Sequence, residues 1–115
     1  MTDGNNDQLQ VAFPASPTFT RIGRVAVVGL ALRLGIDVAT VERLRSAVDT
    51  AVSALQGAGR ISARASWSPA ELQIILSNPD ASVADPVALS DQLTELIGDV
   101  SVDNHQVVLT LLTDA

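Results

Sequence analysis

The sequence contains no cysteine and no lysine, and aromatic residues make up only 3% of it. The absence of cysteine excludes a disulfide framework, a thiolate metal site and a cysteine nucleophile. The single histidine, His105, cannot form a histidine metal cluster on its own. Hydrophobic residues make up 47% of the 115 positions, which is enough for the core of one compact domain. With so few aromatics, that core must consist of Val, Leu, Ile and Ala.

Basic residues are missing from the part of the chain beyond residue 64. All seven are arginines and none lies beyond Arg64, whereas eight acidic residues follow it. Residues 21–64 carry a net charge of +4, although the whole chain has a net charge of -6. A net acidic protein repels nucleic acid, so we expect no nucleic-acid partner. The asymmetry fits either ordinary solvated faces or a basic protein-docking surface on the first helix, with Arg21, Arg24 and Arg33 as candidates.

Long apolar runs are also missing. The run 25–32 is bounded by Arg24 and Arg33 and is far shorter than the roughly 20 residues that span a bilayer. The first residues are polar and acidic, which is the opposite of a signal peptide. We therefore expect a cytoplasmic protein without a membrane partner, in which residues 1–8 form a disordered tail and residues 9–115 form one domain.

Apolar periodicity and turn residues predict elements in the order β-α-α-β-β-α-β-β. The expected strands cover residues 9–13, 60–67, 72–78, 100–102 and 106–112, and the expected helices cover 18–34, 37–55 and 86–98. This order predicts an α+β two-layer sandwich, with three helices on one face of a mostly antiparallel sheet.

Apolar stripes indicate which helix faces are buried. The first helix should begin after the cap formed by Ser16 and Pro17 and end at Gly35. Its expected buried residues are Ile22, Val25, Ala26, Leu30 and Leu34. The second should begin at or next to Asp37 and bury Val41, Leu44, Val48, Val52 and Leu55. In the third, the apolar positions are Val87, Leu89, Leu93, Leu96 and Ile97.

Several segments carry a family resemblance when taken in order. They are a strand ending in Phe-Pro-Ala-Ser, a helix closing in Leu-Arg-Leu-Gly, the helix Val-Glu-Arg-Leu-Arg-Ser-Ala-Val-Asp-Thr-Ala-Val-Ser-Ala-Leu, and the strand Leu-Gln-Ile-Ile-Leu-Ser-Asn. From Phe13 to Leu112 the chain resembles the GHKL (Bergerat-fold) ATPase domains of anti-sigma-factor serine kinases, the RsbW-like family. The resemblance implies a histidine-kinase-like ATPase fold with a shortened lid.

In that family the second helix carries a catalytic Glu and, four residues later, an Asn that holds magnesium. The matching positions here are Asp49 and Ser53, which share one helix face. Asp is too short by about 1 Å, a displacement that can cost ~100-fold in rate, and Ser is a weaker magnesium ligand. An active enzyme would use Asp49 as base and Ser53 on the metal. On its own, Asp49 is better interpreted as a solvated residue that pairs with Arg45.

The family's second motif, Asp-x-Gly-x-Gly, reads adenine after a strand. Asn78, Asp80 and Ser82 occupy those positions here. Asn78 could still accept from the adenine amine, whereas Asp80 places a charge where the backbone must approach. The remnant nucleotide-binding set is therefore Asn78, Asp80 and Ser53. An ordinary turn is the alternative. The sequence also lacks glycine between Gly59 and Gly98, where a phosphate cradle would need it.

These departures predict a regulatory protein-interaction domain without kinase activity, catalytic residue, metal or cofactor. By the resemblance, its partner would be a sigma factor, an anti-anti-sigma protein or a sensor domain, and a homodimer is plausible. The alternative is an active anti-sigma serine/threonine kinase that binds ATP with magnesium. We expect His105 to be solvated in a turn. Trp67 should cap the core or serve as an exposed anchor.

Overall fold

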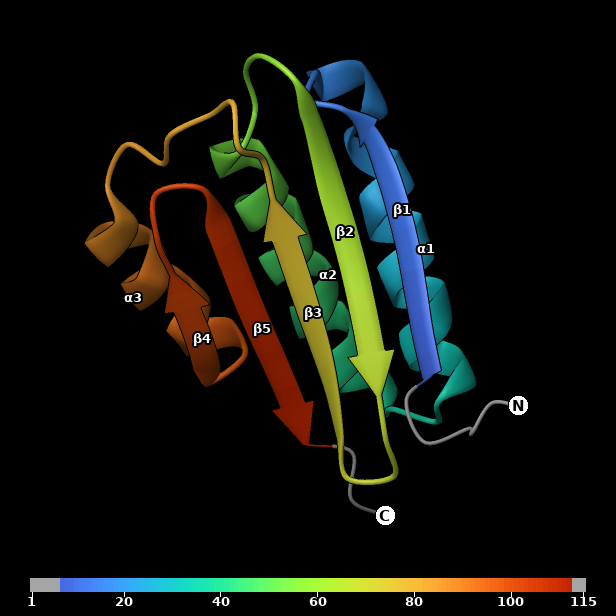
Figure 1. The fold of residues 1–115 in the computed structure, drawn as a ribbon. Helices are drawn as coiled ribbons and strands as arrows, with labels where there is room; N and C mark the ends of the chain where they lie inside the picture. The colour runs from blue at the N-terminus through green and yellow to red at the C-terminus, as the bar shows by residue number, and fades with distance from the viewer. Residues whose placement is uncertain (1–6, 113–115) are drawn as a thin grey trace.

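One antiparallel sheet and three α-helices make up residues 7–112, the part of the chain that the structure, a computed structural model, describes (Figure 1). The helices lie on one face of the sheet, which gives the α+β arrangement predicted from the sequence. In chain order the elements are β1 (Asp7–Pro14), the 3-10 turn η1 (Pro17–Phe19), α1 (Thr20–Arg33), α2 (Val38–Ala54), β2 (Arg60–Trp67), β3 (Glu71–Ser77), α3 (Pro86–Leu96), β4 (Asp99–Val102) and β5 (Gln106–Leu112).

The strands lie in the order β1-β2-β3-β5-β4, and every neighbouring pair is antiparallel. β2–β3 and β4–β5 are the predicted hairpins, and β1 and β4 form the two edges of the sheet. Alternation gave the bounds of β2 correctly, because Ile61, Ala63 and Ala65 are buried while Arg64 is exposed.

The core lies between the sheet and the helices. It is aliphatic apart from Phe13, as the composition predicts. The stripe predicted for α2 is confirmed, because all five positions are at most 3% exposed. Burying each such side chain contributes about 1.5–3 kcal/mol, so α2 is held mainly by its inner face. The largest fully buried side chains are Phe13, Leu44, Leu55, Ile61, Leu72, Ile74, Leu76, Leu93 and Leu109.

Asp37 caps α2 at its N-terminus, as predicted. Its carboxylate accepts hydrogen bonds from the Thr40 hydroxyl at 2.7 Å and from the Thr40 backbone N–H at 3.1 Å. These two bonds, the hydroxyl first, lower the pKa of Asp37. Gly35 ends the preceding helix with a φ of 81°, a conformation that glycine adopts without strain.

The buried face predicted for α1 is right only in part. Leu30 is buried and Leu34 packs half-buried against the core, as predicted, but Ile22 and Val25 are not buried. Ile22 and Val25 are 41% and 58% exposed, whereas Gly23, Val27, Leu30 and Ala31 are buried. The cause is a contact with β1, because a Cβ on Gly23 would come within 2.9 Å of Phe13 Cζ. The missing side chain of Gly23 lets the helix settle onto the Phe13 ring, and this contact turns Ile22 and Val25 outward.

Smaller differences lie at element ends. Asp7 and Gln8, predicted to belong to a tail, are in β1 opposite Trp67 and Ser66, and the other six tail residues lie outside the described part. Two positions differ in the third helix. It ends at Leu96 rather than Gly98, because Gly98 turns the chain toward β4 with a φ of 96°. Val87 in its first turn is 71% exposed.

Candidate functional site

The carboxylate of Asp49 is held by α1. Arg24 Nη1 donates to Asp49 Oδ2 at 3.0 Å, and both side chains are about one-third exposed. The predicted pairing with Arg45 is wrong, because Arg45 donates instead to Glu42 one turn earlier. α1 lies against α2, so a guanidinium from the neighbouring helix reaches Asp49 across the helix pair. The residue matching the family's catalytic base is thus part of the α1–α2 interface.

Ser53 lies one turn beyond Asp49 on α2 and is exposed. The other oxygen of Asp49, Oδ1, is buried and has no hydrogen-bond partner among the residues described. Within this part of the chain no hydrogen bond or ion pair joins the side chain of Asp49 or Ser53 to that of Asn78 or Asp80. The two predicted motifs are therefore placed on neighbouring elements without forming one set of ligands.

Asn78 is fully buried and is the one polar residue of the core within residues 7–112. Its amide Nδ2 donates to Leu55 O at 2.9 Å and to Ala58 O at 3.0 Å. Its Oδ1 accepts from the Asp80 backbone N–H at 3.0 Å. The side chain thus connects the end of β3 to the loop after α2, and both amide hydrogens are used. As folded, Asn78 presents no surface to an adenine ring.

Asp80 and Ser82 are exposed in the loop that follows β3. Asp80 lies directly against Gly59, so closely that a Cβ on Gly59 would overlap its carboxylate. Gly59 also has a φ of 79°, which disfavours any other residue there. The loop that holds Gly59 and the loop that holds Asp80 thus meet at the position where glycines of the resembling family would let the backbone approach the nucleotide.

The loop from 78 to 85, which stands where the resemblance places the lid, is fastened to the β4–β5 turn. The Val83 N–H donates to Asn104 O at 2.7 Å, and the Asn78 N–H donates to His105 O at 2.9 Å. His105 is exposed, as expected, but its ring Nδ1 also contacts the Ala81 carbonyl. Ala81 and Val83 are buried, so the loop is packed onto the domain.

These contacts do not fit ATP with magnesium. The adenine reader has no exposed surface, the candidate base is paired with Arg24, and Asp80 places a carboxylate beside the closest backbone approach. A triphosphate at this position would be repelled by the Asp80 carboxylate, and the motif supplies no matched magnesium ligand that would offset this repulsion. We therefore assign no catalytic step to these residues.

The outer face of α1 is the most apolar exposed helix surface in the described chain. We define it as Ile22, Val25, Gly29 and Leu32 with the arginines Arg21 and Arg33, all of which are exposed and lie on one side of the helix. Val25 and Leu32 are 58% and 52% exposed. This exposed face was not predicted from the sequence, because Ile22 and Val25 were expected to be buried in the core. The spacing 22, 25, 29 and 32 is itself a helical stripe that could have indicated a second apolar face.

Two of the three candidate docking arginines are free to contact a partner. Arg21 and Arg33 are exposed and form no ion pair with a carboxylate of the described chain, whereas Arg24 is engaged by Asp49. Arg21 and Arg24 also line a surface pocket of about 550 Å³ at the start of α1. Arg21 and Arg33 therefore stay candidate docking residues, whereas Arg24 has an internal partner.

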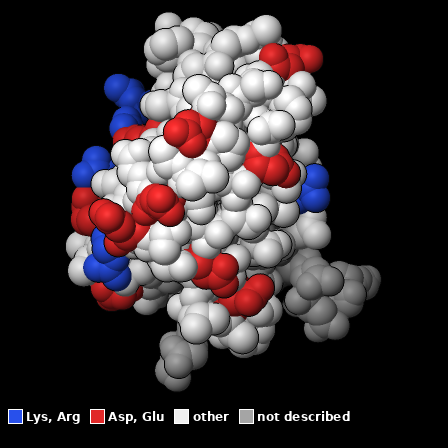
Figure 2. Space-filling model, turned by 90° about the vertical axis from the view of Figure 1, so that its left-hand side faces the viewer, with Lys and Arg blue, Asp and Glu red and all other residues white. Residues whose placement is uncertain are grey.

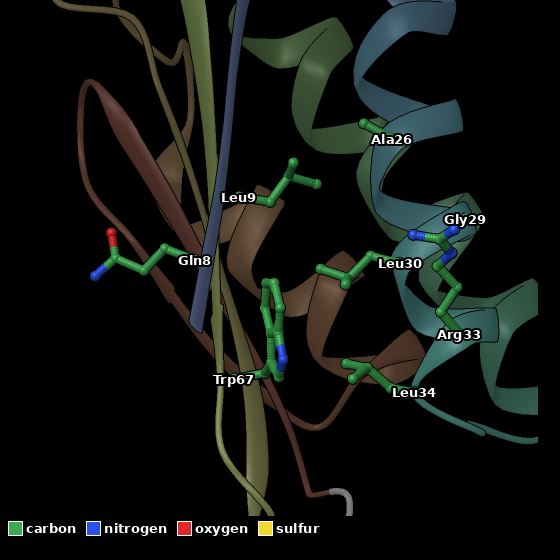
Figure 3. Close-up of a pocket in the computed structure, with 8 residues that line it drawn as sticks. All are labelled: Gln8, Leu9, Ala26, Gly29, Leu30, Arg33, Leu34 and Trp67. Atoms are coloured by element: carbon green, nitrogen blue, oxygen red, sulfur yellow. The ribbon is translucent and has the colours of Figure 1, made fainter. Parts of the chain in front are cut away.

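A groove of about 530 Å³ lies between α1 and the sheet, next to the edge strand β1 (Figure 3). We call it the α1–β1 groove. Leu9 and Trp67 point from the sheet toward Leu30 and Leu34 of the helix. Its remaining lining residues are Gln8, Ala26, Gly29 and Arg33. Gly29 and Arg33 belong also to the outer face of α1, so the two surfaces adjoin.

The opposite end of the molecule is acidic. On the side seen in Figure 2, acidic side chains are spread over the surface and basic ones lie toward its margins. The α3 and β4 segments contribute the exposed Asp91, Glu95 and Asp99 and contain no basic residue. Charge is therefore separated in space as well as in sequence.

Within residues 7–112, no helix combines the length and apolar character needed to cross a bilayer. No three acidic or histidine side chains of this region come together as a metal-ion site. Comparison of the chain with protein-family models and with curated proteins finds no match.

Proposed function

We propose that this chain is a regulatory protein-interaction domain that docks a partner through the outer face of α1 and does not transfer phosphate. The observation that carries the proposal is the apolar stripe of Ile22, Val25 and Leu32, bordered by unpaired arginines. Exposed apolar side chains grouped on one helix, with charges at the rim, are typical of a protein-binding surface.

The contacts around Asn78 and Asp49 support the second half of the proposal. Residues that would read adenine and activate a hydroxyl are used to hold β3, α1 and α2 together. The resemblance to GHKL domains then concerns the framework, and we propose the histidine-kinase-like ATPase fold as the ancestry of this sheet and helix order. By that resemblance the partner is a sigma factor, an anti-anti-sigma protein or a sensor domain.

The test compares two double variants in a pull-down from the native cell extract. Val25→Glu with Leu32→Glu places charges on the outer face of α1. Val38→Glu with Val87→Glu is the matched control, because these valines are 69% and 71% exposed on α2 and α3. We expect the first variant to lose the co-purifying partner and the control to retain it. Retention by both variants would contradict the docking surface.

A calorimetric titration with Mg-ATP tests the absence of kinase chemistry. It should be run on the isolated chain and on any complex recovered from the pull-down. We expect no magnesium-dependent heat of binding in either sample. Micromolar, magnesium-dependent ATP binding, with phosphate transfer to the partner that Asp49→Ala abolishes, would support the kinase alternative instead.

A further inference from the structure

We propose that the α1–β1 groove binds an extended acidic segment of the partner. The segment would add to the free edge of β1, insert one large apolar side chain between α1 and the sheet, and place a carboxylate beside Arg33. This inference rests on the proposed function, because it names the chemistry of the partner that the α1 surface docks.

The first support is the free edge of β1, which pairs with β2 and with no other strand in residues 7–112. Just beyond β1, the Ala15 N–H donates a hydrogen bond of 3.0 Å to Gly59 O, which directly precedes β2. The backbone groups of Ala15 therefore point toward β2. Because backbone groups alternate in direction along an antiparallel strand, those of Gln8 and Gln10 point away from β2. An extended segment can bond to these groups, as in strand addition to other sheets.

The second support is the apolar slot beside that edge. Leu9, Leu30, Leu34 and Trp67 converge from the sheet and the helix, and Leu9 is still 38% exposed (Figure 3). No other atom lies within 4 Å of the position of a Cβ on Gly29, so the groove is open on the helix side. Every second side chain of a paired strand points to the same face, so a segment lying on β1 would direct alternate side chains toward this slot.

The third support is charge. Arg33 lines the groove and pairs with no carboxylate in the described chain, and α1 carries three arginines without an acidic residue. A second copy that paired through β1 would bring two such helices together and place like charges near one another. An acidic segment has the complementary charge, and we therefore favour it over self-association.

Trp67 provides a direct readout, because it is the chain's one tryptophan and it lines the groove. The full chain would be titrated with a blocked peptide in which Leu and Glu stand two residues apart with Ser between them, so that both face the helix side of the sheet, while the Trp67 fluorescence is followed. We call it the Glu-Leu peptide. Matched peptides replace Glu by Lys, or Leu by Ser, or carry N-methyl groups on the backbone edge that faces β1. These peptides test charge, apolar anchoring and strand pairing separately.

We expect the Glu-Leu peptide to shift the Trp67 emission and the three matched peptides to bind at least about tenfold more weakly. Arg33→Glu should reverse the preference between the Glu and Lys peptides. Arg43→Glu is the control, because this exposed arginine lies on α2, outside the docking surface, and is not among the groove's lining residues. Equal binding of the Glu and Lys peptides, or an unchanged preference in Arg33→Glu, would overturn the proposal.

Sedimentation of the chain over a range of concentrations tests whether a second copy of the chain, rather than a partner segment, occupies the β1 edge. A dimer that the Glu-Leu peptide does not dissociate would assign the β1 edge to a second copy and overturn the proposal. Failure here is distinguishable from failure of the proposed function. If no peptide binds the groove, but the natural partner is still lost with Val25→Glu and Leu32→Glu, the docking function stands and the strand-addition mode is wrong.

Discussion

At the scale of single residues, Asn78 shows how neighbours decide a role. Its position after a strand is where the resembling family places the residue that reads adenine. In this fold the same amide is surrounded by the carbonyls of Leu55 and Ala58 and the N–H of Asp80. An amide supplies both donors and an acceptor, and a carboxylate supplies acceptors alone. The asparagine is therefore explained by the protein's own hydrogen bonds.

The substitution Asn78→Asp separates the structural role from an adenine-reading role. It restores the family's residue but directs a carboxylate from a fully buried position at two backbone carbonyls, so we expect a loss of about 2–4 kcal/mol in the free energy of unfolding. Urea unfolding measures this loss. Asp80→Asn, which keeps the Asn78 amide, should stay within about 0.5 kcal/mol of the wild type. Wild-type stability of Asn78→Asp together with acquired Mg-ATP binding would contradict the structural role.

At the scale of elements, α1 is apolar on two sides, and its glycines distinguish them. Gly23 faces the Phe13 ring at close range, whereas the space around Gly29 is open. Both are helix positions at which alanine is intrinsically preferred by about 1 kcal/mol. The two glycines therefore form a matched pair that reports which face of the helix is packed.

We expect Gly29→Ala to stabilise the protein by about 0.5–1 kcal/mol, because it gains helix propensity without a steric conflict. Gly23→Ala makes the same gain, but its new methyl group would push on the Phe13 ring, and such overpacking costs about 1–3 kcal/mol. The net effect of Gly23→Ala should be destabilisation. Thermal unfolding of both variants measures the difference, and equal stabilisation would mean that α1 packs through another face.

The elements that were predicted correctly are those whose local sequence pattern allows only one choice of buried face. Alternation gave β2 its bounds, and one clear stripe gave α2 its buried face. α1 offered two apolar stripes, and the choice between them depended on a contact between Phe13 and Gly23, which lie on different elements.

The candidate site depended on long-range contacts in the same way. Arg24 and Asp49 are 25 residues apart, and Asn78 lies 23 residues from Leu55. Periodicity could place Asp49 on a helix face and Asn78 at a strand end, and both placements are correct. It could not show that their hydrogen-bonding groups are used inside the fold, because no local pattern records which distant groups they meet.

At the scale of the whole molecule, charge is divided between two regions with different consequences. α1 carries three arginines and no acid, whereas every charged residue beyond Arg64 is acidic. Like charges in the second region repel each other in the folded domain, while the arginines of α1 attract an acidic partner. Added salt screens both effects. Salt should therefore change folding and partner binding in opposite directions.

We expect the thermal midpoint to rise by about 2–5 °C between roughly 10 and 150 mM salt, because the screening length falls from about 30 Å to about 8 Å. The variant Asp91→Asn, Glu95→Gln and Asp99→Asn removes exposed acids of α3 and β4 that make no hydrogen bond or ion pair in the described chain, and should lose much of this rise. Over the same range, partner binding through Arg21 and Arg33 should weaken, because screening removes the attraction that the docking surface supplies. Partner binding that strengthened with salt would show that apolar contact alone holds the complex, and would remove the arginines from the docking surface.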